Sequence, residues 1–139
     1  MDKKKFKPEV IRPKDMQHTM YLGVDFGVIL HREKSEALEV LLERFPKGMK
    51  FRVHQHKECI QFYYILEGKA NITLEGTDHT VGPGESVYIP RFTDHGIENI
   101  GDGELVYLNT EVYPDGYLPD EPTWDAHIAA LETLDRKSS

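Results

Sequence analysis

The feature that most constrains the fold of this chain is its division, from residue 21 onward, into short apolar or alternating runs separated by glycine and proline. Alternation with a period of two is typical of strands buried on one face, and regularly spaced turns favour a sandwich or a barrel. The stretch 35–45 also carries leucines at helical spacing, and we assign it as a strand. The expected strands are 21–30, 38–45, 49–54, 62–66, 70–74, 86–89, 96–100 and 105–112.

The two ends of the chain differ from this pattern. The first twenty residues open with a basic run and show no strand or helix period, so we expect an arm that lies over the surface. Thr123 is expected to cap a C-terminal helix in which Trp124 and Ile128 lie on one face. The predicted organisation is an N-terminal arm (1–20), a barrel (21–118) and a C-terminal helix with its tail (119–139).

Composition excludes several classes of partner. The chain has 17 Lys and Arg against 24 Asp and Glu, a net charge of -7, whereas nucleic-acid binders need a basic face, so no nucleic-acid partner is expected. The longest apolar run, 62–66, is far shorter than the roughly 20 residues that span a bilayer, and no membrane partner is expected. Cys59 is the single cysteine, which excludes an internal disulfide and favours a cytoplasmic location.

Histidines at two places in the sequence form the pattern that carries chemistry. His54 and His56 are two residues apart, so in an extended strand both imidazoles point to the same face. His95 lies on a distant expected strand and could complete a facial set, with the Gln61 carbonyl oxygen as a weaker fourth ligand. The sequence therefore predicts a site for one divalent transition metal, either nickel, zinc, manganese, iron or copper. Neutral ligands would leave the full charge of the ion to polarise a substrate oxygen.

The spacing of these residues resembles the two motifs of the cupin superfamily, G-x5-H-x-H-x3,4-E-x6-G and G-x5-P-x-G-x2-H-x3-N. The resemblance covers residues 48–99 and implies an all-β fold, a small double-stranded β-helix or jelly-roll barrel. Gln61 stands where the family has glutamate, and Phe92 stands where it has glycine. The ligand set is similar to that of small pectin-degradation cupins of the KdgF type, which act on unsaturated monouronates. In those enzymes a late acidic segment supplies a catalytic residue, and residues 111–114 are its nearest match here.

The strand 105–112 decides which side chains would surround the metal. One alternating set contains Tyr107, Asn109 and Glu111, the other is apolar, and the sequence leaves open which of them faces inward. If the polar set faces inward, Glu111 is expected to act as a general acid or base together with Tyr63. Tyr107 and Asn109 would then bind substrate.

Other residues with chemical potential are less specific. Arg91 follows a proline at the expected mouth of the barrel, where it could receive a substrate carboxylate or phosphate, the alternative being an exposed loop arginine. Four histidines have no partner at ligand spacing and are expected on the surface. They are His18, His31, His79 and His127.

The resemblance implies a metal-dependent enzyme whose small-molecule substrate is a small oxygenated metabolite. The implied reaction is the non-redox isomerisation or hydration of a sugar or sugar acid. Two alternatives remain open, an iron- or copper-dependent dioxygenase and a non-catalytic ligand-binding cupin. Phe62 and Tyr64 point away from Gln61 and would be unusual on an exposed sheet. They predict a homodimer packed through sheet faces, unless the arm or the helix covers them.

Overall fold

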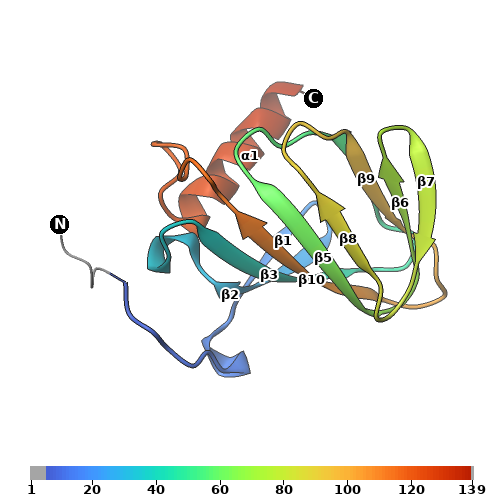
Figure 1. The fold of residues 1–139 in the computed structure, drawn as a ribbon, viewed down its shortest axis with the longest axis horizontal. Coiled ribbons are helices and arrows are strands. Elements are labelled where there is room, and N and C mark those ends of the chain that lie inside the picture. Colours follow the sequence, from blue (N-terminus) through green and yellow to red (C-terminus); the bar gives the residue numbers. More distant parts are fainter. Residues whose placement is uncertain (1–5, 139) are drawn as a thin grey trace.

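Residues 6–138, with the side chains of residues 6–134, are described by the computed structural model. Within this range the chain forms two antiparallel sheets that face each other, followed by a C-terminal helix (Figure 1). The elements are η1 (Pro13–Asp15), β1 (Gln17–Tyr21), β2 (Val24–Leu30), η2 (Arg32–Lys34), β3 (Leu38–Phe45), β4 (Lys50–His54), β5 (Ile60–Glu67), β6 (Ala70–Leu74), β7 (Thr77–Val81), β8 (Ser86–Ile89), β9 (His95–Asn99), β10 (Leu105–Val112) and α1 (Trp124–Ser138). The prediction of an all-β fold with one C-terminal helix is confirmed.

The larger sheet has the strand order β1-β2-β3-β10-β5-β8, and the smaller sheet has the order β4-β9-β6-β7. The ambiguous stretch before residue 45 is a strand, because buried and half-buried residues alternate along β3. Its inward residues are Glu39, Leu41, Glu43 and Phe45. Two of the four are acidic, which places carboxyl groups inside the barrel.

The sequence did not predict two of the strands, both of which lie at sheet edges. β1 takes in residues 17–20 of the predicted arm and pairs with β2. β7 pairs with β6, and four of its five residues are exposed. An edge strand with both faces near solvent needs no alternation of polarity, so its sequence carries no period of two. The basic run at the start of the predicted arm lies outside the described residues.

Aromatic side chains fasten α1 to the core between the two sheets. Trp124 is buried, with its ring 6.0 Å from that of Phe26, which in turn lies 6.1 Å from the ring of Phe51 on the smaller sheet. Ile128, one turn further along the helix, belongs to the same core. The Ala126 amide donates to Thr123 Oγ1 at 3.1 Å, which confirms the predicted N-cap.

Two short loops join the sheets at one end of the barrel, which we call the site end. Loop 55–59 connects β4 to β5, and loop 90–94 connects β8 to β9. The Phe92 amide donates to the His56 carbonyl at 2.9 Å and ties the two loops together. β10 and β3 meet here too, because Val112 pairs with Leu38. The segment that leads from β10 to α1 therefore starts at the site end.

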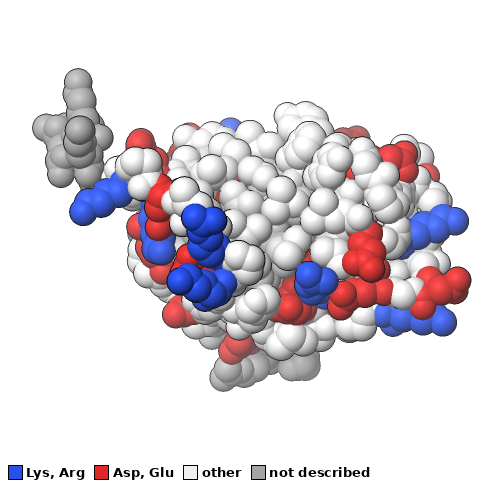
Figure 2. All heavy atoms as spheres, turned by 90° about the horizontal axis from the view of Figure 1, so that it is seen from below, with Lys and Arg blue, Asp and Glu red and all other residues white. Residues whose placement is uncertain are grey.

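The charged side chains are distributed without a dominant basic area on the face shown in Figure 2, where Lys and Arg lie among Asp and Glu. This agrees with the excess of acidic residues in the sequence. Within residues 6–138, no helix combines the length and the apolar character that a membrane crossing requires.

Candidate metal centre

The structure brings the three predicted histidine ligands together at the site end. One ring nitrogen each of His54, His56 and His95 lies within 4.8 Å of the others. The Nε2 atoms of His54 and His56 are 3.2 Å apart. His54 ends β4 and pairs across the sheet with His95, which begins β9. The strand pairing, rather than a flexible loop, therefore sets the position of two of the three imidazoles.

Backbone carbonyls fix the tautomers of two of these rings. His54 Nδ1 lies 2.7 Å from the Arg52 carbonyl oxygen, and His95 Nδ1 lies 2.9 Å from that of Thr93. A carbonyl only accepts, so Nδ1 carries the hydrogen in both rings and Nε2 carries the lone pair. His95 Nε2 is buried and has no hydrogen-bond partner in the described part of the chain. Metal-binding histidines have this arrangement, with the second nitrogen bonded to a backbone carbonyl.

Burial keeps the imidazoles of His56 and His95 neutral. It lowers the pKa of His56 to about 3, and the neighbouring His54 and His95 act in the same direction. Burial also lowers the pKa of His95. A histidine must be unprotonated to bind a metal, so both rings are ready as ligands at neutral pH. Three imidazole nitrogens this close together fit zinc, copper, iron or nickel.

Across the barrel, the polar set of β10 faces inward, which answers the question that the sequence left open. Gln61 Nε2 donates to Glu111 Oε2 at 2.6 Å, and the Tyr63 hydroxyl donates to Gln61 Oε1 at 3.2 Å. Gln61 and Glu111 are cross-strand partners on β5 and β10. Gln61 is therefore part of a buried hydrogen-bond network, and its carbonyl oxygen stays available as an acceptor.

Glu111 is bound by three side-chain donors. Besides Gln61, it accepts hydrogen bonds from Asn109 Nδ2 at 3.3 Å and from the Tyr113 hydroxyl at 3.4 Å. Burial raises the pKa of Glu111, and the hydrogen bond from Gln61 opposes this. A carboxyl group whose pKa is raised by burial can hold or release a proton nearer to neutral pH than an exposed one.

Glu43 occupies the next position deeper in the barrel and was not predicted from the sequence. Its two oxygens accept hydrogen bonds from the Tyr107 hydroxyl at 2.6 Å and from Asn109 Nδ2 at 2.7 Å. Burial raises the pKa of Glu43 to about 7. The predicted substrate-binding residues Tyr107 and Asn109 therefore contact another protein side chain in this structure.

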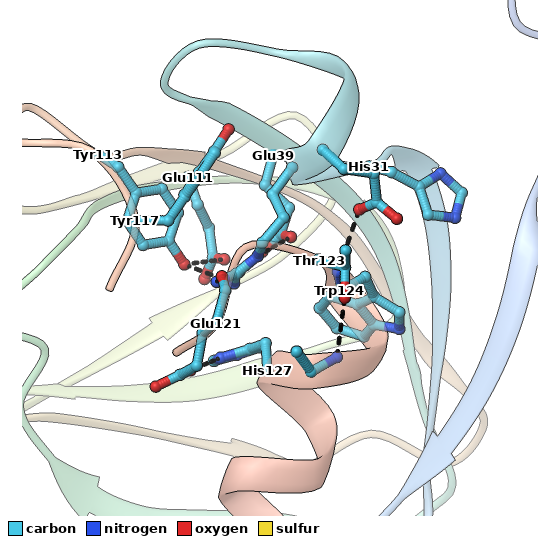
Figure 3. Close-up of polar contacts among 12 residues, drawn as sticks. His31, Glu39, Glu111, Tyr113, Tyr117, Glu121, Thr123, Trp124 and His127 are labelled. Carbon is cyan, nitrogen blue, oxygen red and sulfur yellow. Dashed lines mark hydrogen bonds and ion pairs between the residues drawn. The ribbon is translucent and has the colours of Figure 1, made fainter. Parts of the chain in front are cut away.

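Arg32 and Glu39 form a buried ion pair, and neither residue was predicted. Figure 3 shows Glu39 close to Glu111 and Tyr113. The Arg32 guanidinium donates to both carboxylate oxygens of Glu39, at 2.7 and 2.9 Å, and to the Tyr113 hydroxyl at 3.0 Å. Burial alone would lower the pKa of Arg32, but the hydrogen bond to Glu39 and nearby charges raise it. Burial raises the pKa of Glu39, and Arg32 opposes this. If the odd-numbered residues of β3 had been assigned to the inward face, Glu39 and Glu43 would have been expected inside the barrel. No feature of the sequence indicated that Arg32 is buried.

Arg91 lies on loop 90–94 at the site end, as its position after a proline predicted. Its Nη1 donates to Asp115 at 2.9 Å. The neighbouring Phe92 has a positive φ of 65° and an exposed side chain. Residues other than glycine rarely adopt this left-handed conformation, which explains why the motif has glycine at this position.

The prediction that His127 lies on the surface was wrong. Its side chain is 22% exposed, and Nδ1 lies 2.6 Å from Glu121 Oε1. His127 lies in the first turn of α1, and its ring packs 5.6 Å from that of Trp124. The helical stripe starting at Trp124 could have indicated this, because a residue three positions further lies on the same face. Cys59 is buried and forms no disulfide, consistent with a small hydrophobic side chain.

Comparison with known proteins identifies the fold family. The family model described as "Cupin domain" matches residues 41–111. An uncharacterised protein of Methanocaldococcus jannaschii is 43% identical over 63 residues, which are 45% of this chain and 50% of that protein. This chain therefore spans half of the length of that relative.

Solved structures show the same fold. A protein described as a predicted oxalate decarboxylase from Thermotoga maritima has a TM-score of 0.69 and 22% identity, covering 76% of this chain and 99% of the other. KdgF from a Halomonas species has a TM-score of 0.67 and 21% identity, covering 78% and 97%. At these identities the likeness extends to the fold.

Proposed function

This chain belongs to the cupin family, and we propose that it is a metal-dependent enzyme that isomerises or hydrates a small sugar or sugar acid without redox chemistry. The observation that carries the proposal is that the site end combines a set of possible metal ligands with a buried acidic group. Three imidazole nitrogens lie close together on the smaller sheet and its loop, and a buried carboxyl group with a raised pKa lies on the larger sheet. A Lewis acid beside a proton carrier is what such reactions require.

His54, His56 and His95 would hold one divalent cation, with Gln61 Oε1 as a fourth ligand. When bound, the cation would supply Lewis-acid polarisation of a substrate oxygen. Gln61 suits this role because Glu111 binds its amide nitrogen and thereby fixes which atom of the amide is the acceptor. No ligand in this set carries a negative charge, so the cation would keep its charge for the substrate.

Glu111 would exchange a proton with the substrate at its carboxyl group. Tyr63, hydrogen-bonded to Gln61, would relay or donate a second proton at its hydroxyl. Tyr107 and Asn109 donate hydrogen bonds to Glu43 in this structure. They would orient the substrate by sharing these hydrogen bonds between Glu43 and the substrate. Arg91 would bind a substrate carboxylate in exchange for the exposed Asp115.

The test is turnover of unsaturated monouronates by the zinc-, nickel- or manganese-loaded protein, compared with Glu111→Gln. We expect the variant to lose about 100-fold or more in kcat, since general acid–base groups contribute that much, while its metal content stays the same. Glu67→Gln, at an exposed position on the same sheet, is the control and should keep full activity. Equal turnover by Glu111→Gln and the wild type would contradict the assignment of Glu111.

The identity of the bound metal distinguishes this proposal from a dioxygenase and from a ligand-binding cupin. A site filled with iron or copper and uptake of oxygen during turnover would favour a dioxygenase, because histidine ligands with open positions also serve oxygen activation. A protein that binds a small molecule tightly without turnover would favour a ligand-binding cupin.

We also propose that two copies associate through the outer face of the larger sheet. Phe62, Tyr64 and Tyr88 are exposed there on neighbouring strands, and neither the described arm nor α1 covers them. Apolar patches of this kind are typical of interfaces, and a second copy presents the same patch. Light scattering should give a dimer for the wild type and a monomer for Phe62→Lys. Met20→Lys, at an exposed position on β1, should remain dimeric. A monomeric wild type would contradict this proposal.

A further inference from the structure

One of the three histidines at the metal centre, His56, is held less directly than the other two. His54 and His95 pair across the smaller sheet, and a backbone carbonyl accepts a hydrogen bond from Nδ1 of each ring. His56 lies beyond the end of β4, in loop 55–59. Among the residues that the structure describes, its ring has no such carbonyl partner, and its Nε2 lies 3.2 Å from that of His54. The position of this imidazole therefore depends on what fixes the loop.

The strand ladder beside the ligands is irregular and stops before His56. Phe51 pairs with Ile97 and the next pair is His54 with His95, so β4 carries an extra residue between these pairs. An extra residue of this kind bends the strand and interrupts its hydrogen bonds to the neighbour. Because β4 then ends at His54, contacts outside the ladder must hold the segment that carries His56.

A hydrogen bond on the outer side of the centre joins the two segments that carry the ligands. Alternation directs His54 and His56 to one side of the chain and Gln55 to the other. Gln55 Nε2 donates to Asp94 Oδ1 at 2.8 Å, and both side chains are exposed. Asp94 directly precedes His95, so this bond links the residue between two ligands to the neighbour of the third. We call this pair of side chains the outer clamp.

Backbone contacts anchor one end of the outer clamp. The Asp94 carbonyl accepts a hydrogen bond from the Glu75 amide at 2.8 Å, which ties Asp94 to the turn between β6 and β7. The Gln55 end belongs to loop 55–59, which is also held by the bond from the Phe92 amide to the His56 carbonyl. A hydrogen bond to a carboxylate is stronger than one between neutral groups. The clamp therefore ties the mobile partner of the two to a fixed one.

We propose that Gln55 and Asp94 are positioning residues that set the metal affinity of the three-histidine centre by holding His56 close to the other ligands. This inference rests on the metal binding in the proposed function and extends it to residues outside the ligand set. When the binding-competent arrangement of a site is only partly populated, the apparent dissociation constant rises by the inverse of that fraction. The outer clamp keeps loop 55–59 in the competent arrangement before a metal arrives.

The first test is competition between the full chain and a fluorescent zinc chelator at neutral pH. Gln55→Ala and Asp94→Ala each remove one side of the clamp. We expect the dissociation constant for zinc to rise about tenfold in each variant, the lower end of what contacts outside the ligand set contribute. The double variant should lose no more than either single variant, because both substitutions break the same contact.

Two further variants separate the clamp from the charge of Asp94. In Asp94→Asn the amide oxygen can still accept from Gln55 Nε2, so zinc affinity should stay within about threefold of the wild type. Glu104→Ala is the matched control, since it removes an exposed carboxylate that accepts from Arg44 at the opposite end of the barrel. It should leave zinc affinity unchanged. A loss in Asp94→Asn as large as that in Asp94→Ala would overturn the proposal, because the charge and not the clamp would then set the affinity.

The second test needs no metal. Hydrogen exchange of the Phe92 amide reports opening of loop 55–59, because this amide is bonded to the His56 carbonyl. In the metal-free protein we expect this amide to exchange several-fold faster in Gln55→Ala than in the wild type, and at the wild-type rate in Glu104→Ala. Equal exchange in Gln55→Ala and the wild type would contradict a loop held by the clamp.

The two tests together distinguish failure of the clamp from failure of the proposed function. If the wild type binds zinc and Gln55→Ala binds it equally well, the clamp is wrong and the metal-dependent function stands. If the wild type takes up no zinc, the metal-dependent function is wrong and the clamp falls with it, whatever the exchange rate of the Phe92 amide.

Discussion

The inner faces of the two sheets differ in chemistry. The smaller sheet and its loop contribute three imidazoles whose ring nitrogens converge, and burial lowers the pKa of two of them, His56 and His95. The larger sheet contributes three buried carboxyl groups, from Glu39, Glu43 and Glu111, against one buried guanidinium, Arg32. One face thus provides neutral donors for a cation, and the other provides groups that hold protons. The difference indicates how a single barrel can combine metal binding with acid–base chemistry.

The two faces also reach their arrangement in different ways. The imidazoles of His54 and His95 are fixed by backbone carbonyls and by strand pairing, so they depend little on other side chains. The carboxyl groups depend on one another through a chain of side-chain hydrogen bonds from Glu43 to Arg32. A change in this chain should therefore affect the stability of the protein more than a change among the histidines.

The largest effect is expected from Arg32→Met. Removal of the guanidinium leaves the Glu39 carboxylate buried without its partner, which typically costs about 3–5 kcal/mol. Urea denaturation at pH 7 measures the loss in the free energy of unfolding. Arg44→Met is the control, because its ion pair with Glu104 is exposed and should contribute less than about 1 kcal/mol. Equal losses in the two variants would contradict a structural role for the buried pair.

A smaller effect, with a defined pH dependence, is expected from Glu43→Gln. Burial raises the pKa of Glu43 from 4.5 to about 7, so the folded protein binds this proton more tightly than the unfolded chain. The associated stability is fully present below about pH 4.5 and is lost as the pH rises through 7. Glu43→Gln removes this loss and should be more stable than the wild type by about 1–3 kcal/mol at pH 8.

Denaturation at pH 5 and pH 8 checks the Glu43 prediction, since the advantage of Glu43→Gln should shrink toward pH 5. An advantage that does not change with pH would show that Glu43 is ionised across this range in the folded state.

The smallest effect is expected from Phe92→Gly. A non-glycine residue at φ 65° is strained by about 1–2 kcal/mol. Glycine relieves this strain, but the higher entropy that glycine gives the unfolded chain offsets part of the gain. We expect a net gain of about 0.5–1 kcal/mol in the free energy of unfolding. Tyr88→Gly is the matched control, because Tyr88 is equally exposed but lies in a strand. It should lose stability, and a loss in both variants would exclude strain at Phe92.

The difference between the two faces also explains how much could be predicted from the sequence. Ligands at fixed offsets on paired strands leave a motif, so His54, His56 and His95 could be identified before the structure was known. The carboxyl network leaves none, because Arg32 and Glu39 meet through a loop conformation that spacing does not encode. The helical stripe from Trp124 could have placed His127 on the inward face, but its partner Glu121 lies outside the helix and no spacing marks it. The edge strands β1 and β7 were missed because neither alternates in polarity.

The central claim is that the three imidazoles hold one divalent metal ion. Elemental analysis of protein purified without a metal-affinity tag, beside the His54→Ala, His56→Ala double variant, tests this directly. We predict close to one equivalent of a transition metal in the wild type and less than about a tenth of that in the variant, because two of the three ligands are lost. Wild-type protein that contains no metal and cannot be loaded with zinc, nickel, manganese, iron or copper would contradict the claim.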